Sequence, residues 1–371
     1  IPKVCKLGCY INIAVTLKEN TSWAAAGYEI ASMQFRLPVK TVGVLERISY
    51  GGIRKDEDDE YITVNGYNFK YVFNKYYNSF ESIETNGYEL LSDRTKYSTR
   101  RAAIDNFGAI KHQWKIPQDG LALYDINELA NVKSIRVKTY IDNSGNCVID
   151  AHSVMQTPGR TNIFDDIYTQ YLIEKSGVIK IRVKALNCNL DILPRFGMEI
   201  ALAGNKDVVE YYGMGPDENY LDMNRHTKVG MYKTTVQEMH FPYIRPQDCG
   251  NRTNVKLVGV SDILGRGMVF FSEDKFEFSA SKYTEEEISL ANHQWDLKPG
   301  EKTYIRIDYK VTGVGSGGLK KFTADEYMLK ENEFSYSFEM LPIIRGNDRI
   351  LDLIKKKQNN LMKGAKVYGQ V

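Results

Sequence analysis

Residues 179–185 read Ile-Lys-Ile-Arg-Val-Lys-Ala and decide the fold class of this sequence. Apolar residues occupy every second position and basic residues fill the positions between, as in an extended strand with one buried and one solvated face. The same alternation recurs at residues 66–73, 135–141 and 305–311. Sheets with one wet face are typical of antiparallel architecture, so the sequence predicts an all-β protein with antiparallel sheets.

The composition agrees with this fold class and excludes several kinds of partner. The 371 residues include 25 Tyr and 15 Phe, which favour strands, and 29 Gly, which favour turns. Lys and Arg total 49 against 47 Asp and Glu, so no global positive field exists to hold nucleic acid. No apolar stretch is long enough to span a membrane. We therefore expect neither a nucleic-acid partner nor a membrane.

Helix signals are confined to two places. Thr284 followed by Glu287 forms a capping box and predicts a helix to about Asn292, with Ile288 and Leu290 reaching the core. At the C-terminus, Asp348 is suited to cap a second helix. That helix would carry apolar residues inward and the basic run 355–357 near its negative end.

The organisation of the chain is indicated by one charged run and by its first residue. Residues 54–60 are densely charged and follow Gly51-Gly52, which predicts an exposed linker between two β regions. The sequence begins at Ile1 without an initiator Met or a signal peptide, so we expect a piece of a longer protein.

The five cysteines form no zinc-type or disulfide-type spacing, and we expect small buried side chains in a reducing compartment.

One stretch combines acids, aromatics and turn residues densely enough to suggest a site. Residues 211–220 read Tyr-Tyr-Gly-Met-Gly-Pro-Asp-Glu-Asn-Tyr. Acids beside aromatic rings suit sugar binding. The alternative, which we favour, is a structural corner shaped by Gly and Pro and fixed by hydrogen bonds from Glu218 and Asn219.

The glycine-rich run 313–318 lacks a following helix signal, so it predicts a loop rather than a phosphate cradle.

From this stretch onward the sequence resembles the C-terminal domain of the family-two glycoside hydrolases known as β-galactosidases. The resemblance rests on residues 212–220, then on Asp222, Gly230-Met-Tyr232, Pro242-Tyr243 and Gly250-Asn-Arg252. Matches also occur at residues 193–197, 291–293 and 313–315, at residues 101–106, and at residues 17–34, which look like the last strands of an immunoglobulin-like domain.

The resemblance implies the following domains. Residues 1–53 would be the end of the immunoglobulin-like β-sandwich and a linker. Residues 54–344 would be a large antiparallel supersandwich, similar in fold to galactose mutarotases. Residues 345–371 would be a C-terminal extension, which we expect to be helical and for which the family offers no role.

The resemblance also implies a divided active site. The parent enzyme would hydrolyse terminal β-D-galactosyl residues with retention, as in lactose catabolism, using two glutamates of a (β/α)₈ barrel. No matching glutamate motif occurs here, so we expect the chain alone to be inactive and to frame the site beside its partner barrel domain. Further implied features are a β-galactoside at the domain edge, a homo-oligomeric parent, and Mg and Na in the other domains, with no cofactor in this chain. We expect a cytoplasmic location, with the periplasm as the alternative.

Two loops would border the substrate in such a site. They contain Asp105, Asn106, Gly108, His112, Gly315, Ser316, Leu319 and Lys320. A third acid is replaced by Phe107, and the second loop has no Trp, which departs from the family pattern. The motif residues expected to be structural are Gly213, Gly215, Pro216, Glu218, Asn219, Tyr220 and Arg252. No residue of this chain is expected to be catalytic or to bind a metal.

Two other functions stay open. The chain could be a free-standing small subunit that restores activity to a large catalytic chain. It could also be a mutarotase-like carbohydrate-binding domain or isomerase acting through a His and a Glu on the concave sheet.

Overall fold

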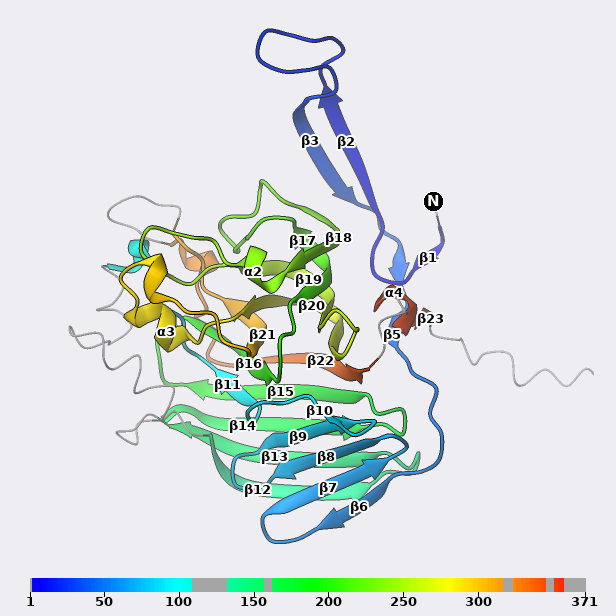
Figure 1. Ribbon diagram of the computed structural model, residues 1–371. Helices are drawn as coiled ribbons and strands as arrows, with labels where there is room; N and C mark the ends of the chain where they lie inside the picture. The colour runs from blue at the N-terminus through cyan, green and yellow to red at the C-terminus, as the bar shows by residue number, and fades with distance from the viewer. Residues whose placement is uncertain (1, 109–131, 157–161, 316–322, 345–349, 357–371) are drawn as a thin grey trace, which may run out of the picture.

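The computed structural model describes residues 2–108, 132–156, 162–315, 323–344 and 350–356. Almost all regular structure in these ranges is β-strand, and every strand pair but one is antiparallel (Figure 1). The predicted all-β class is therefore confirmed. No helix within these ranges has the length and apolarity needed to cross a bilayer.

A 12-stranded sheet forms the body of the molecule. Along the sheet its main path runs through β11 (Lys96–Ser98), β16 (Arg195–Leu202), β21 (Thr303–Val311), β20 (Gly267–Ser281), β22 (Phe334–Ile343), β15 (Ile179–Cys188), β14 (Asn162–Ile173), β13 (Cys147–Gln156) and β12 (Val132–Ile141). A branch leaves β20 through β19 (Arg252–Ser261), β17 (Val208–Gly215) and β18 (Lys228–Thr235).

A five-stranded sheet lies in front of β12 to β14 (Figure 1). Its strands are β6 (Arg54–Glu57), β7 (Tyr61–Gly66), β8 (Phe69–Asn74), β9 (Ser79–Thr85) and β10 (Tyr88–Glu89). Rings from both sheets meet in the core, where Phe73 and Phe80 pack edge-on against Tyr171. The Tyr171 hydroxyl donates a 3.0 Å hydrogen bond to the Asn78 carbonyl, so the buried ring also fixes how the layers are placed.

The first part of this sheet corrects two sequence predictions. The charged run 54–60 is not a linker, because its first four residues form β6 and pair with β7. Residues 66–73 are not one strand, because Gly66 and Phe69 pair across a two-residue turn. Asn68 has a φ of 61° and Tyr67 is 57 % exposed, so the tyrosine lies at the hairpin tip instead of in the core.

The alternation of charged residues has different meanings in different strands. In β15 the prediction holds, since Arg182 and Lys184 are exposed while their neighbours are buried. In β21 the prediction of a wet face is wrong, because Arg306 and Asp308 are 2 % and 0 % exposed. Ile135 of β12 also departs from its expected buried face, since it lies at a β-bulge and is 55 % exposed.

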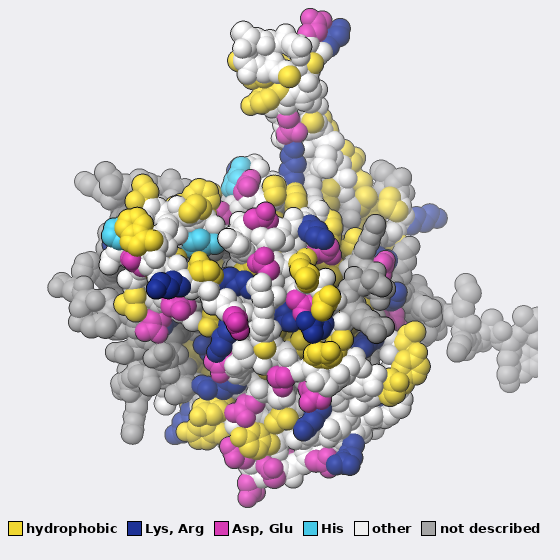
Figure 2. All heavy atoms as spheres, in the orientation of Figure 1, with side chains coloured by type: hydrophobic (Ala, Val, Ile, Leu, Met, Phe, Trp, Pro, Cys, Tyr) yellow, Lys and Arg dark blue, Asp and Glu magenta, His cyan; other side chains and the backbone are white. Residues whose placement is uncertain are grey.

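The base of the N-terminal region packs on the sandwich, because Leu7 and Leu45 share an apolar cluster with Phe271 and Leu341 of the 12-stranded sheet. The region contains β1 (Val4–Cys5), β2 (Tyr10–Thr16), β3 (Glu29–Arg36), β4 (Lys40–Thr41) and β5 (Gly43–Leu45). The β2–β3 hairpin projects outward and carries apolar side chains on its surface (Figures 1 and 2). Ile13 and Met33 face each other across it and are 54 % and 62 % exposed. At its base Gln34 exchanges two hydrogen bonds with the backbone of Val229, at 2.7 and 2.8 Å.

Helical segments in the described ranges are short. They are α2 (Val236–Met239), α3 (Glu285–Leu290), α4 (Ile350–Leu353) and the 3₁₀ turns η1 (Asp105–Gly108), η2 (Gln294–Asp296) and η4 (Asp325–Tyr327). The capping box of Thr284 and Glu287 is confirmed at the start of α3. The helix ends two residues before the expected Asn292, and Leu290 is 63 % exposed, so only Ile288 of the two predicted core residues is buried.

The C-terminal extension returns to the N-terminal region. The predicted long helix is wrong within the described residues, because α4 ends at Leu353 and β23 (Ile354–Lys356) then pairs with β5. Pairing with β5 puts Ile354 beside Leu45 in a small apolar core that also contains Leu7. Burial of Ile354, which is 0 % exposed, favours the strand over a continued helix.

Candidate functional site

Two of the loops singled out by the sequence lie together at one edge of the sandwich. The first contains Asp105, Asn106 and Gly108 in η1, and the second follows β21 and contains Gly315. The Asn106 side-chain amide donates a 3.0 Å hydrogen bond to the Val314 carbonyl. The structure therefore brings these four predicted site residues to one place.

Asp222 fixes the second loop from the opposite side. Its two carboxylate oxygens accept hydrogen bonds of 2.9 and 2.8 Å from the backbone amides of Val314 and Gly315. A Cβ at Gly313 would lie 2.5 Å from this carboxylate, so only glycine allows the close approach. Gly315 has a φ of 94°, which also favours glycine. Residues 313–315 of the loop are therefore fixed by these contacts.

The remaining predicted site residues, His112, Ser316, Leu319 and Lys320, lie outside the described residues.

The motif at residues 211–220 forms a corner between β17 and its neighbours. Side chains at Gly213 and Gly215 would collide with Val255 and Tyr211, and the Gly215–Pro216 peptide is cis. Arg252 donates a 3.0 Å hydrogen bond to the Tyr211 hydroxyl. Close packing therefore requires glycine at both positions of the motif.

The polar side chains of this corner bind protein groups. Glu218 accepts hydrogen bonds from the Tyr243 hydroxyl and, at 2.8 Å, from the Gly250 amide. Asn219 donates to the Met214 carbonyl at 3.1 Å and accepts from the Thr253 amide at 2.8 Å. These contacts are of the kind that fix a loop to a sheet.

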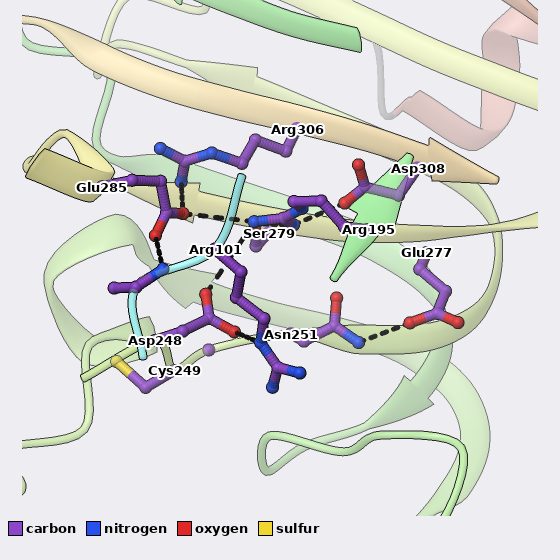
Figure 3. Close-up of polar contacts among 12 residues, drawn as sticks. Arg101, Arg195, Asp248, Cys249, Asn251, Glu277, Ser279, Glu285, Arg306 and Asp308 are labelled. Atoms are coloured by element: carbon purple, nitrogen blue, oxygen red, sulfur yellow. Dashed lines mark hydrogen bonds and ion pairs between the residues drawn. The ribbon is translucent and has the colours of Figure 1, made fainter. Parts of the chain in front are cut away.

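A buried network of charged residues lies beneath both loops (Figure 3). Its members come from different strands and loops and are all less than 8 % exposed: Arg101, Arg195, Glu199, Asp248, Glu277, Glu285, Arg306 and Asp308. Arg195 contacts Asp308 at 2.5 Å and Glu285 at 3.1 Å. Arg306 contacts the same Glu285 oxygen at 3.2 Å and Glu199 at 2.9 Å. Buried cations and carboxylates are thus paired throughout the core of the network.

Arg101 connects this network to the site edge. Its guanidinium contacts Asp248 at 2.5 Å and donates hydrogen bonds of 2.5 and 3.4 Å to the carbonyls of Thr312 and Gly313. Arg101 lies four residues before Asp105, so one side chain links the start of the first loop to the start of the second. Both loops are therefore attached to the rigid interior, where a precise site would need them.

Glu277 is the strongly perturbed carboxyl of this interior. Burial raises its pKa to about 8, although the Asn251 amide donates a 2.7 Å hydrogen bond to it. Glu277 is 4 % exposed, so it is a buried acid of the interior.

A cysteine and a histidine that the sequence showed as isolated meet near the corner. Cys249 Sγ lies 3.5 Å from His240 Nδ1, and His240 Nε2 lies 3.1 Å from the Gln294 side-chain oxygen. Burial, with the nearby Glu218 and Asp248 carboxylates, raises the pKa of the Cys249 thiol above its ordinary value. The thiol stays protonated at neutral pH, so this arrangement does not make an activated nucleophile.

Among the residues that the structure describes, no three His, Cys, Asp or Glu side chains are grouped to hold a metal ion.

Sequence reasoning missed the buried network and the role of Asp222. The network residues are ordinary strand or loop residues in the sequence, and the separation of paired residues ranges from 21 positions for Arg306 and Glu285 to 147 for Arg101 and Asp248. The alternation of charged and apolar residues in β21 was visible in the sequence. It fits both a strand with one solvated face and a strand whose charged side chains are buried beside partners, and only the positions of those partners distinguish the two cases.

Family comparisons match most of the chain. The family described as "Beta galactosidase small chain" matches residues 65–340, and "Beta-galactosidase, domain 4" matches residues 2–38. Two similar curated relatives are β-galactosidases of Priestia megaterium and Actinobacillus pleuropneumoniae, 28 % and 25 % identical over 90 % and 89 % of this chain. The alignments cover 31 % and 32 % of those proteins, so the chain spans about a third of their length.

Comparison with solved structures gives weaker matches. A galactose 1-epimerase from Lactobacillus acidophilus aligns with 80 % of this chain and 97 % of its own, at 10 % identity and a TM-score of 0.35. A score this low carries no conclusion about function. The small-chain family match at residues 65–340 covers well over half of the sequence. The chain belongs to the β-galactosidase small-chain family.

Proposed function

We propose that this chain is the C-terminal portion of a β-galactosidase and that it frames an active site whose catalytic glutamates lie in another part of the parent protein. The observation that carries the proposal is the order of the two family matches. A domain 4 segment at residues 2–38 precedes a small-chain segment at residues 65–340.

The geometry of the site edge supports this role. Asn106 and Asp222 hold the 313–315 loop against η1, and the interior ion pairs hold both loops in turn. A rigid pair of loops on a sheet is suited to border a sugar that is bound mainly by a neighbouring domain. The parent reaction would then be hydrolysis of terminal β-D-galactosyl residues with retention.

The exposed hairpin supports the same assignment. β2 and β3 expose apolar side chains mainly on one face, where Ile11 pairs with Phe35 and Ile13 with Met33, as expected for strands of a sandwich whose other strands are supplied from elsewhere. The hairpin would be covered by the rest of its own domain in the parent protein.

The proposal is tested by assaying the purified chain with o-nitrophenyl β-galactoside. We expect no hydrolysis above that of a buffer control. The same chain fused to the reading frame upstream of Ile1 is expected to hydrolyse the substrate, and Asp222→Ala in the fusion is expected to alter KM. Enzyme-like turnover by the isolated chain would overturn the proposal.

The family description as a small chain favours a second candidate, a separate subunit that restores activity to a large chain. Mixing the purified chain with the separately expressed upstream part tests it. Recovery of activity on mixing would support a subunit, whereas activity in the fusion alone would support a portion of one chain.

A further inference from the structure

The outer face of β12 to β15 and β22 carries a regular array of polar side chains, which we call the polar face. Two rows cross these five adjacent strands in register. The first is Arg136, His152, Tyr168, Lys184 and Ser335, and the second is Lys138, Asp150, Gln170, Arg182 and Ser337. These ten residues line a cavity of about 780 Å³, on the opposite side of the sheet from the core. That volume lies within the roughly 300–1,000 Å³ of small-ligand sites.

Four cations of the polar face have no partner among the described residues. They are Arg136, Lys138, Arg182 and Lys184, all exposed and none engaged in an ion pair or hydrogen bond. By contrast, Lys180 on the same strand and face is paired with Glu174 at 2.7 Å. Like charges held close together repel, and an anion between them would relieve that repulsion.

The carboxylates of the polar face are already engaged by neighbouring side chains. Asp150 accepts a 2.9 Å hydrogen bond from Gln170, and Asp166, beside the rows, lies 2.6 Å from His152 Nε2. Asp274 also lines the cavity. Within the described residues none of these three carboxylates forms an ion pair with one of the four cations, so the cationic groups stay open to an anion. These carboxylates also interrupt the positive charge, which disfavours a continuous phosphate backbone such as that of nucleic acid.

The uncharged groups between the cations suit a sugar. The rings of His152 and Tyr168 stack with centroids 4.3 Å apart, both residues line the cavity, and Tyr168 is 44 % exposed. Gln170, Ser335 and Ser337 line the same cavity with amide and hydroxyl groups that can bind sugar hydroxyls. Rings, hydroxyl partners and spaced cations together match a carbohydrate that carries negative charge.

We propose that the polar face binds an acidic oligosaccharide, one whose pyranose rings carry carboxylate or sulfate groups. Arg182 and Lys184 on β15 bind the acidic groups, with Arg136 and Lys138 on β12 at the far end of the cavity. The site lies on a different part of the sheet from the paired loops at the galactosidase edge and does not depend on that assignment.

Isothermal titration of the full chain tests the proposal. The probes are trigalacturonate, which carries carboxylates, and a heparin-derived tetrasaccharide, which carries sulfates, with maltotriose as the neutral control. We expect at least one acidic probe to bind, more weakly at higher salt, and maltotriose not to bind. Arg182→Gln combined with Lys184→Gln should weaken the binding roughly tenfold, as expected when charge-assisted contacts are lost.

Two further variants make the result specific. Lys180→Gln, on the same strand and face, should leave the affinity unchanged because its charge is already paired. The double variant Arg136→Gln and Lys138→Gln, at the other end of the cavity, should also weaken binding. It replaces the β15 variant in the test if that variant does not fold. The proposal is overturned if neither acidic probe binds, if maltotriose binds equally well, or if the cation variants bind like the wild type. Equal affinity for a short single-stranded DNA would show a general anion surface and would also overturn it.

Discussion

The Asp308 carboxylate of β21 lies 2.5 Å from the Arg195 guanidinium of β16, and neither side chain is more than 1 % exposed. The pair crosses two adjacent strands and forms the centre of the buried network. Removing one partner would leave the other charged and buried. We expect Asp308→Ala to lower the free energy of unfolding by about 3–5 kcal/mol, measured by urea denaturation.

The control for this variant is Asp56→Ala, which removes an exposed ion pair with Arg54. Its denaturation midpoint should be unchanged. A small effect of Asp308→Ala would show that water reaches Arg195 and that the network is not a closed interior.

Glu277 should make stability depend on pH. Its folded-state pKa of about 8 lies above the ordinary value of 4.5, so the folded protein keeps the proton that the unfolded chain loses. This contribution is complete below about pH 4.5 and is lost as pH rises to about 8. The side chain of the Glu277→Gln variant cannot ionise, so its free energy of unfolding should fall less than that of the wild type between about pH 4.5 and about pH 8.

Urea midpoints at pH 5, 7 and 8.5 measure this effect, with the exposed Glu301→Gln as the matched control. Parallel pH profiles for Glu277→Gln and the wild type would contradict the assignment.

Asp222 should control the local order of the 313–315 loop. Asp222→Ala removes the acceptor for the amides of Val314 and Gly315, so their hydrogen exchange should accelerate by about tenfold or more. Asp217→Ala, on the exposed side of the same corner, should leave both rates unchanged. Unaltered exchange in Asp222→Ala would show that the Asp222 carboxylate does not hold the loop.

Ile354 should stabilise the attachment of the N-terminal region. Its side chain is fully buried beside Leu45, so Ile354→Ala should cost about 2–5 kcal/mol of stability. Thermal denaturation and limited proteolysis between β5 and β6 measure the effect. The exposed Leu290→Ala is the control, and equal effects of the two variants would argue against a specific role of β23.

The β2–β3 hairpin should drive self-association of the isolated chain. Ile13 and Met33 form an exposed cross-strand pair, so Ile13→Lys with Met33→Lys should lower the average mass toward the 42.4 kDa monomer. Sedimentation equilibrium gives this mass. A wild-type chain that is already monomeric at high concentration would contradict the prediction.

The parts of the fold that were predictable depend on neighbours in sequence. The capping box at Thr284 acts over three residues, and the alternation in β15 acts over seven. The burial of Arg306 was not predictable, because it depends on Glu285 and Glu199, which the fold brings from distant positions. The strand at β23 was missed for the same reason, since its partner β5 lies about 310 residues earlier.

The candidate site was predictable only as two loops. The resemblance indicated residues 105–108 and the run after Gly313, and the structure places their described parts together. The resemblance could not indicate that Asp222 binds one loop or that Arg101 links the two. Both side chains bind backbone groups of the loop, and nearly every residue type carries the same backbone groups, so the loop sequence does not reveal these contacts.

The pairing of β5 with β23 joins the two ends of the described chain by three residue pairs. A force applied to the projecting hairpin would load the two hydrogen bonds between Gln34 and Val229 at its base. It would also pass along β4 and β5 to the short sheet with β23, where the apolar core that Leu45 and Ile354 share with Leu341 of the sandwich is the resisting contact. Mechanical separation in a single-molecule pulling experiment would therefore begin at these contacts, and the paired loops would keep their geometry while the hairpin was pulled away.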